Sequence, residues 1–158
     1  MHVLFKAGLL AAFLSTAAPL ALARPAQTPA MDLVQRQHLG SNLKTIALAT
    51  AQKTETYAVL ASGVGAAKAK TLVSKELNSH AREFEGQWNK NLAGIYAHHF
   101  TPEELTSLAK EGGKSKYARK MVEKQGEIGG EMRRQSTPIL ISYVTAAMKS
   151  ALAKASAK

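Results

Sequence analysis

The feature that most constrains the fold is a long series of apolar residues at helical spacing between Ala66 and His99. Its members are Val73, Leu77, Ala81, Phe84, Trp88, Leu92, Ile95 and His99. Successive members lie three or four residues apart, which places them on one stripe of an α-helix about 50 Å long. Charged residues of the segment, Glu76 among them, fall away from the stripe. We expect Phe84 and Trp88, in its middle, to anchor the core rather than to form a ligand platform.

The rest of the chain has the composition of a helical protein. Alanine, leucine, lysine, glutamate and glutamine are abundant, and the alternation of β-branched residues that is typical of strands is nearly absent. The sequence therefore predicts an all-α fold, a bundle of about four to six helices. The predicted helices are, in order, 29–53, 54–64, 66–99, 102–112, one from about 115, and a last one that Pro138 begins or kinks and that ends near 154.

The N-terminus has the three parts of an export signal. Lys6 supplies the positive charge, residues 7–14 are apolar, and Ala21 and Ala23 form a small-residue cleavage site. The alternative is an uncleaved membrane anchor, but the charge-free stretch that ends at Ala23 is near the lower limit for spanning a bilayer and contains Pro19. We predict a signal peptide over 1–23, cleaved after Ala23, and therefore a periplasmic or secreted protein without a transmembrane segment.

The mature chain is predicted to contain one domain. A flexible, proline-rich lead-in over 24–30 precedes a single helical domain over 31–155, which is long enough for one modest core. The chain has no cysteine. This excludes disulfides, thiol catalysis, cysteine-ligated zinc or iron–sulfur sites and the lipid attachment of a bacterial lipoprotein.

Residues 100–105 read as a complete helix start. Thr101 is placed to cap the helix, Pro102 fits its first position, and the Glu104 side chain can return to the Thr101 backbone in a capping box. Glu103 suits the positive end of the helix dipole. We interpret these two glutamates as structural residues.

The sequence offers no set of residues that makes a catalytic, cofactor or metal site. His98 and His99 lie beside the glutamates, but adjacent helical residues point about 100° apart, so we do not expect the pair to face one metal ion. His80 and Glu83 have a spacing that lets them share an ion, yet two ligands do not make a site. The sequence does not exclude a catalytic serine–histidine–carboxylate set, because its members can lie far apart along the chain. Gly63 and Gly65 are interpreted as a helix end, since no strand precedes them.

The basic balance, a formal net charge of +10, favours anionic partners. Lys116, Lys120 and Lys124 recur on one helix face with Arg119 beside them, and they are the candidate contact with an anionic surface. The alternative is a solvated helix face that binds nothing. An envelope protein, an anionic lipid or a polysaccharide would suit the predicted compartment, and nucleic acid would not.

One segment is similar to a known family. Trp88, Leu92, Ile95, Tyr96, the run 100–105 and Leu108 resemble the Domain of Unknown Function 2059 family, over about 77–132. The resemblance implies an exported, all-helical envelope protein and supplies no catalytic residues. The family commonly continues into an aromatic turn with serine and proline, which residues 109–114 lack, so the chain resembles a divergent member.

Two functions of different classes are therefore expected. The first is a non-enzymatic exported helical protein that binds a protein or an anionic envelope component. The second is a small extracytoplasmic hydrolase with a dispersed active site. The absence of a catalytic motif favours the first.

Overall fold

The computed structural model describes residues 28–157, and this part of the chain is all-α, as predicted. The predicted signal peptide over 1–23 and the first residues of the lead-in lie outside the described residues. The elements are α1 (Pro29–Arg36), α2 (Leu43–Ala51), α3 (Glu55–Val64), α4 (Ala66–His99), α5 (Pro102–Glu111), the short 3₁₀ helix η1 (Gly112–Lys114) and α6 (Ala118–Ser156). Six α-helices and no strand occur among the described residues, which is the predicted class.

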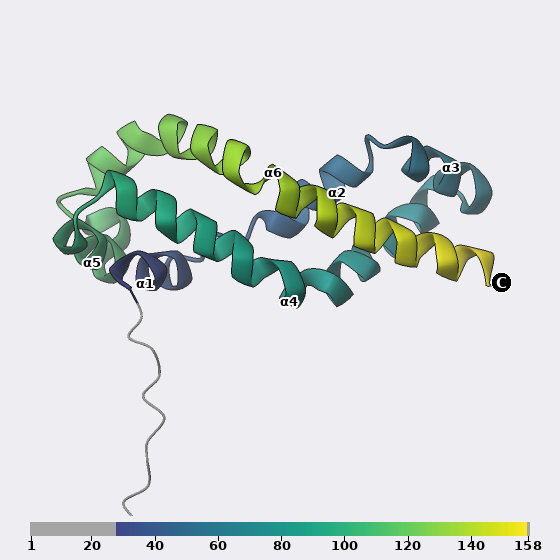
Figure 1. Ribbon diagram of the computed structural model, residues 1–158, viewed down its shortest axis with the longest axis horizontal. Helices are drawn as coiled ribbons and strands as arrows, with labels where there is room; N and C mark the ends of the chain where they lie inside the picture. Colours follow the sequence, from purple (N-terminus) through teal and green to yellow (C-terminus); the bar gives the residue numbers. More distant parts are fainter. Residues whose placement is uncertain (1–27, 158) are drawn as a thin grey trace, which may run out of the picture.

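Two long helices, α4 and α6, form the frame of the molecule (Figure 1). They run antiparallel, because the end of α4 at His99 meets Glu131 of α6, while Glu76 near the start of α4 meets Lys154 near the end of α6. Figure 1 shows α1 and α5 at one end of this pair and α3 at the other, beside the C-terminus. The α2 helix packs against both long helices between these ends.

The predicted stripe of α4 is the centre of the core. Its buried members are Val73, Leu77, Ala81, Trp88, Leu92 and Ile95, while Phe84 and His99 are partly buried. Across the interface, Tyr143 of α6 is completely buried, and its hydroxyl donates a hydrogen bond to the Leu77 carbonyl at 2.6 Å. Burial raises the pKa of Tyr143 to about 12, so the hydroxyl keeps its proton and remains a donor.

The predicted capping box at the start of α5 is confirmed. The Thr101 hydroxyl accepts from the Glu104 amide at 3.3 Å, and the Glu104 carboxylate accepts from the Thr101 amide at 2.9 Å. Pro102 takes the first helical position, where its missing N–H costs nothing. The capping box fixes the start of α5, the helix through which the chain reverses direction between α4 and α6.

The prediction of one helix over 29–53 is wrong, because the chain breaks between α1 and α2. His38 adopts a left-handed backbone with φ of 51°, which ends the helical path. Gly40 then passes close to α4, where a Cβ atom would lie 1.8 Å from Asn89 Oδ1. A larger residue at this position would require the Asn89 side chain to move.

Of the two alternatives predicted for Pro138, that it begins a last helix or kinks it, the first is wrong. Helix α6 begins at Ala118 rather than at Ser115 and continues through Pro138. Proline removes one backbone hydrogen bond from a helix, and the exposed position of Pro138 lets water take the carbonyl that is released. Contacts with α4 on both sides of Pro138, from Glu131 before it and from Tyr143 after it, keep the two halves in one helix.

Candidate functional site

The four cations predicted to contact an anionic surface each pair with a carboxylate of the protein itself. The pairs are Lys116–Glu103 at 3.6 Å, Arg119–Glu123 at 2.9 Å, Lys120–Glu104 at 2.7 Å and Lys124–Glu127 at 2.8 Å. The first turn of α5 supplies two of these carboxylates, and α6 itself supplies the other two. The positive field at this end of the molecule is therefore largely balanced within the fold.

Of these four cations, Lys120 makes the contact that links α6 to the start of α5. Its ammonium contacts Glu104, whose side chain is only 13% exposed, and it lies over the Phe100 ring at 4.9 Å from the centroid. The hydrogen bond from Lys120, together with that from the Thr101 amide, holds the pKa of Glu104 below its usual range. Lys120 thus links α6 to the capping box of α5.

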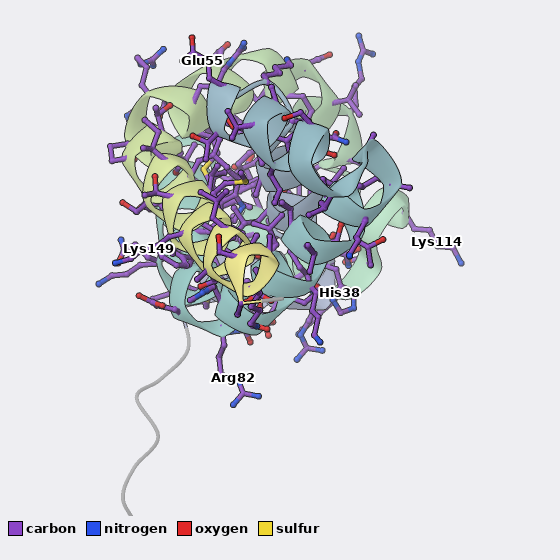
Figure 2. All side chains as sticks on the ribbon, turned by 90° about the vertical axis from the view of Figure 1, so that its right-hand side faces the viewer. His38, Glu55, Arg82, Lys114 and Lys149 are labelled. Atoms are coloured by element: carbon purple, nitrogen blue, oxygen red, sulfur yellow. The ribbon has the colours of Figure 1, made fainter. Side chains whose placement is uncertain are left out.

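A second group of cations lies on the outer face of α4. Lys68, Lys75 and Arg82 are seven residues apart and therefore repeat along one side of the helix, away from the buried stripe. Lys70 is exposed nearby, and none of the four forms an ion pair with another described residue. Figure 2 shows Arg82 extending away from the ribbon into solvent. The sequence itself indicates this excess of positive charge, since no acidic residue occurs between Glu55 and Glu76.

A shallow hollow accompanies these cations, and we call it the α4 hollow. It is lined by Lys70, Thr71, Ser74, Lys75, Asn78 and Ser79. The Thr71 and Ser79 hydroxyls donate to carbonyls of their own helix, while Lys70 and Lys75 are exposed. The lining contains donors and no carboxylate, which is the chemistry that an anion requires.

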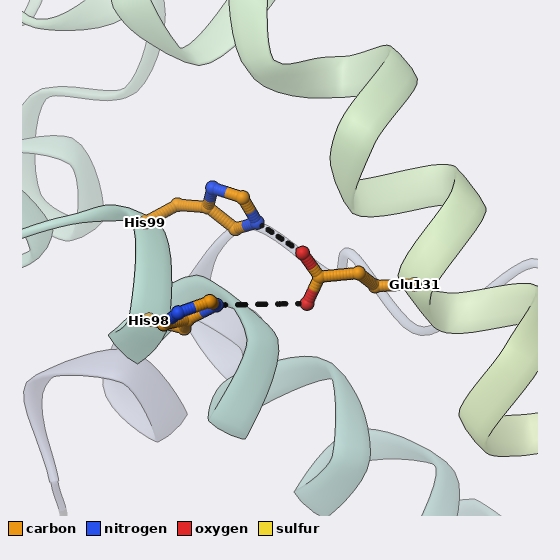
Figure 3. A group of neighbouring side chains, drawn as sticks. All are labelled: His98, His99 and Glu131. Carbon is orange, nitrogen blue, oxygen red and sulfur yellow. Dashed lines mark hydrogen bonds and ion pairs between the residues drawn. The ribbon is translucent and has the colours of Figure 1, made fainter.

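The geometric argument that His98 and His99 cannot face one point does not hold, because one ligand atom from each of them and from Glu131 lies within 4.8 Å of the others. Their ring centroids lie 5.2 Å apart, and each ring faces one oxygen of Glu131 on α6 (Figure 3). Backbone directions differ by about 100°, but an imidazole ring reaches well beyond its Cβ, so two rings can converge on a group between them. Glu131 was missed, because the sequence shows it only as one of several charges on an outer helix face.

His80 lies beside a serine, as the base of a serine hydrolase does. Its Nε2 lies 3.0 Å from the Ser150 hydroxyl, and its Nδ1 lies 3.7 Å from Glu83. A nucleophile, a base and an orienting carboxylate are therefore adjacent. Ser150 and His80 lie within α6 and α4, where the backbone amides donate along the helices. Such amides are not free to stabilise the oxyanion of an acyl-transfer intermediate.

Fold and surface together define a small all-helical protein with an unbalanced cationic face on α4. Comparisons of the chain with protein-family models, curated proteins and solved structures find no match. The resemblance of 77–132 to the Domain of Unknown Function 2059 family therefore stays a prediction from the sequence motif. Over residues 28–157, no helix has both the length and the apolar character that crossing a bilayer demands.

Proposed function

We propose that the chain is exported and that its mature form is a non-enzymatic binding protein of the cell envelope. The three-part pattern of residues 1–23 supports export, and the helical domain begins with α1 at Pro29, soon after the proposed cleavage point. The test is the mass of the protein recovered from the extracytoplasmic fraction. A species that begins at Arg24 is the expected result, and a full-length chain held in the membrane would contradict it.

We further propose that the protein binds anionic, phosphate-bearing lipid headgroups through the outer face of α4. One observation supports this most directly. The lysines of the α4 hollow have no ion-pair partner among the described residues, whereas Lys116, Lys120 and Lys124 are each paired within the fold. An unpaired ammonium can bind an external anion without first breaking an ion pair within the protein. The outer face of α4 is therefore a better candidate for anion binding than the paired lysines of α6.

Vesicle binding tests this proposal. The mature protein is expected to be retained on vesicles that contain phosphatidylglycerol and not on vesicles of phosphatidylcholine alone. Reversing Lys68, Lys70 and Lys75 to glutamate is expected to lower the partition coefficient by at least about 100-fold, since the loss of each lysine near such a surface removes about 1 kcal/mol and each new carboxylate is repelled. Retention of the unmodified protein must also fall as salt rises, because screening shortens the range of the interaction.

The matched control changes the net charge equally at the other end of the molecule. Lys110, Lys114 and Lys116 are exposed, and their reversal to glutamate leaves the Lys120–Glu104 contact in place. This variant is expected to keep most of the retention. Equal losses in the two variants would contradict a site on α4. Retention on a phosphorylated polysaccharide, with none on vesicles, would reassign the ligand and overturn the lipid proposal.

The hydrolase is the second candidate, and the His80–Ser150 contact is what favours it. We place it behind the binding protein for a chemical reason. Acyl transfer depends on donors that are aimed at the developing oxyanion, and the backbone amides around Ser150 donate within α6.

A further inference from the structure

We propose that His98, His99 and Glu131 form a binding site for a divalent transition-metal ion, with Zn²⁺ as the ion that fits their chemistry. One ligand atom from each residue lies within 4.8 Å of the others. The site is at the end of α4 where α5 begins, far along the helix from the α4 hollow, so it is independent of the proposed lipid contact.

The separations of the facing atoms suit a shared ion. Glu131 Oε1 lies 2.9 Å from His99 Nε2, and Oε2 lies 3.7 Å from His98 Nδ1. Two ligands of a tetrahedral Zn²⁺, each about 2.0–2.1 Å from the metal, lie about 3.3 Å from one another. Small side-chain rotations would therefore bring the three groups to bonding distance. Imidazole with a carboxylate selects a metal such as Zn²⁺ over Mg²⁺ or Ca²⁺, which take oxygen ligands.

A fourth residue completes the arrangement around His99. Its Nδ1 faces Glu127 Oε2 at 3.7 Å, while its Nε2 faces Glu131. If Nε2 binds the metal, Nδ1 carries the proton and can donate it to Glu127. This carboxylate–histidine–metal relay fixes the tautomer and orientation of the ligand in many metal sites. Lys124 holds Glu127 in place through contacts of 2.8 and 2.9 Å.

Burial indicates an exchangeable site that opens on one side. The side chains of His99 and Glu131 are 10% and 18% exposed, so two ligands are held in the α4–α6 interface. The His98 side chain is 76% exposed and closes the site from the solvent side. Three protein ligands leave one tetrahedral position for water or an external ligand, unlike the closed four-ligand sites that serve only stability.

Helix α6 explains why these groups meet. Lys124, Glu127 and Glu131 are three and four residues apart, so they share the face of α6 that passes the end of α4. A hydrogen bond between the two helices would need only His99 and Glu131. A metal site also needs a further ligand and a carboxylate that orients His99, and His98 and Glu127 supply these two groups.

Zn²⁺ titration of the untagged mature protein, stripped with EDTA, tests the site. Calorimetry is expected to give one ion per chain. A concentration 100 times the dissociation constant is expected to raise the melting temperature by roughly 5–15 °C, because the ion joins α4 to α6 only in the folded state. Mg²⁺ is expected to have no such effect. A melting temperature unchanged by Zn²⁺, or an equal rise with Mg²⁺, would overturn the proposal.

Substitutions locate the ion. His98→Ala, His99→Ala and Glu131→Gln are each expected to remove the Zn²⁺-dependent rise, and Glu127→Gln is expected to weaken Zn²⁺ affinity by about 10–100-fold. His38→Asn is the matched control, because it removes an exposed histidine elsewhere, and asparagine tolerates the left-handed backbone there. If Glu131→Gln fails to fold, the exposed His98 still decides the matter. Full Zn²⁺ binding by folded His98→Ala would refute the three-ligand site.

Discussion

Replacing Trp88 with alanine is expected to lower the free energy of unfolding by about 3–5 kcal/mol. The indole is 6% exposed, and Met132 and Leu140 of α6 lie with it around a pocket of about 190 Å³ that opens to solvent on one side. Truncation would leave the volume of the indole unfilled beside this pocket, and such a loss of packing is costly because the two long helices relax into it only in part. Urea unfolding followed by circular dichroism measures the loss.

A matched substitution separates packing from hydrogen bonding at this position. Trp88 Nε1 has no hydrogen-bond partner among the described residues, so Trp88→Phe removes no hydrogen bond and keeps part of the ring volume. We expect a clearly smaller loss than for Trp88→Ala. Equal losses for the two variants would contradict a packing role, and an unchanged transition for Trp88→Ala would mean that the α4 stripe is not the core.

The features that the sequence predicted correctly are those set by neighbouring residues. The α4 stripe repeats every three or four residues, so its buried face follows from the sequence alone. The capping box needs only Thr101 and Glu104, which are three residues apart. In both cases the interacting groups lie within one turn or one helix.

The fold features that were missed depend on contacts between distant segments. The break between α1 and α2 places Gly40 against Asn89, and nothing near Gly40 indicates that α4 passes there. Pro138 is a strong local sign of a helix end, yet packing along α4 outweighs the loss of one hydrogen bond. Glu76 falls outside the apolar stripe but is buried, because the end of α6 covers it.

The candidate sites show the same division. The face shared by Lys116, Lys120 and Lys124 follows from helical spacing, but the carboxylates that balance it come partly from α5. Helical spacing also could not place Glu131 between His98 and His99, since the pairing depends on the chain reversing at α5. Sequence spacing identifies which residues share a face, and the tertiary fold decides what that face meets.

Removing the ammonium of Lys154 is expected to lower the free energy of unfolding by about 1–3 kcal/mol. Lys154 Nζ donates to Glu76 Oε1 at 2.6 Å, and the Glu76 side chain is 3% exposed. Lys154→Met keeps the apolar stem and removes the charge, which leaves a carboxylate without its partner in the α4–α6 interface. The Lys154 side chain is 52% exposed, so water can replace part of the lost contact, and this keeps the loss below that of a fully buried pair.

A double-mutant cycle shows whether the loss comes from the pair itself. Glu76→Gln removes the buried charge, so Lys154→Met made in that background is expected to cost much less than it does alone, with a coupling free energy of about 0.5–3 kcal/mol. Lys149→Met is the matched control, because Lys149 lies on the same helix, is exposed and forms no ion pair with a described residue. Its effect is expected to stay within about 0.5 kcal/mol. If Lys154→Met were as neutral as Lys149→Met, the contact with Glu76 would not stabilise the fold, and Glu76 would have to be held by the packing of the two long helices alone.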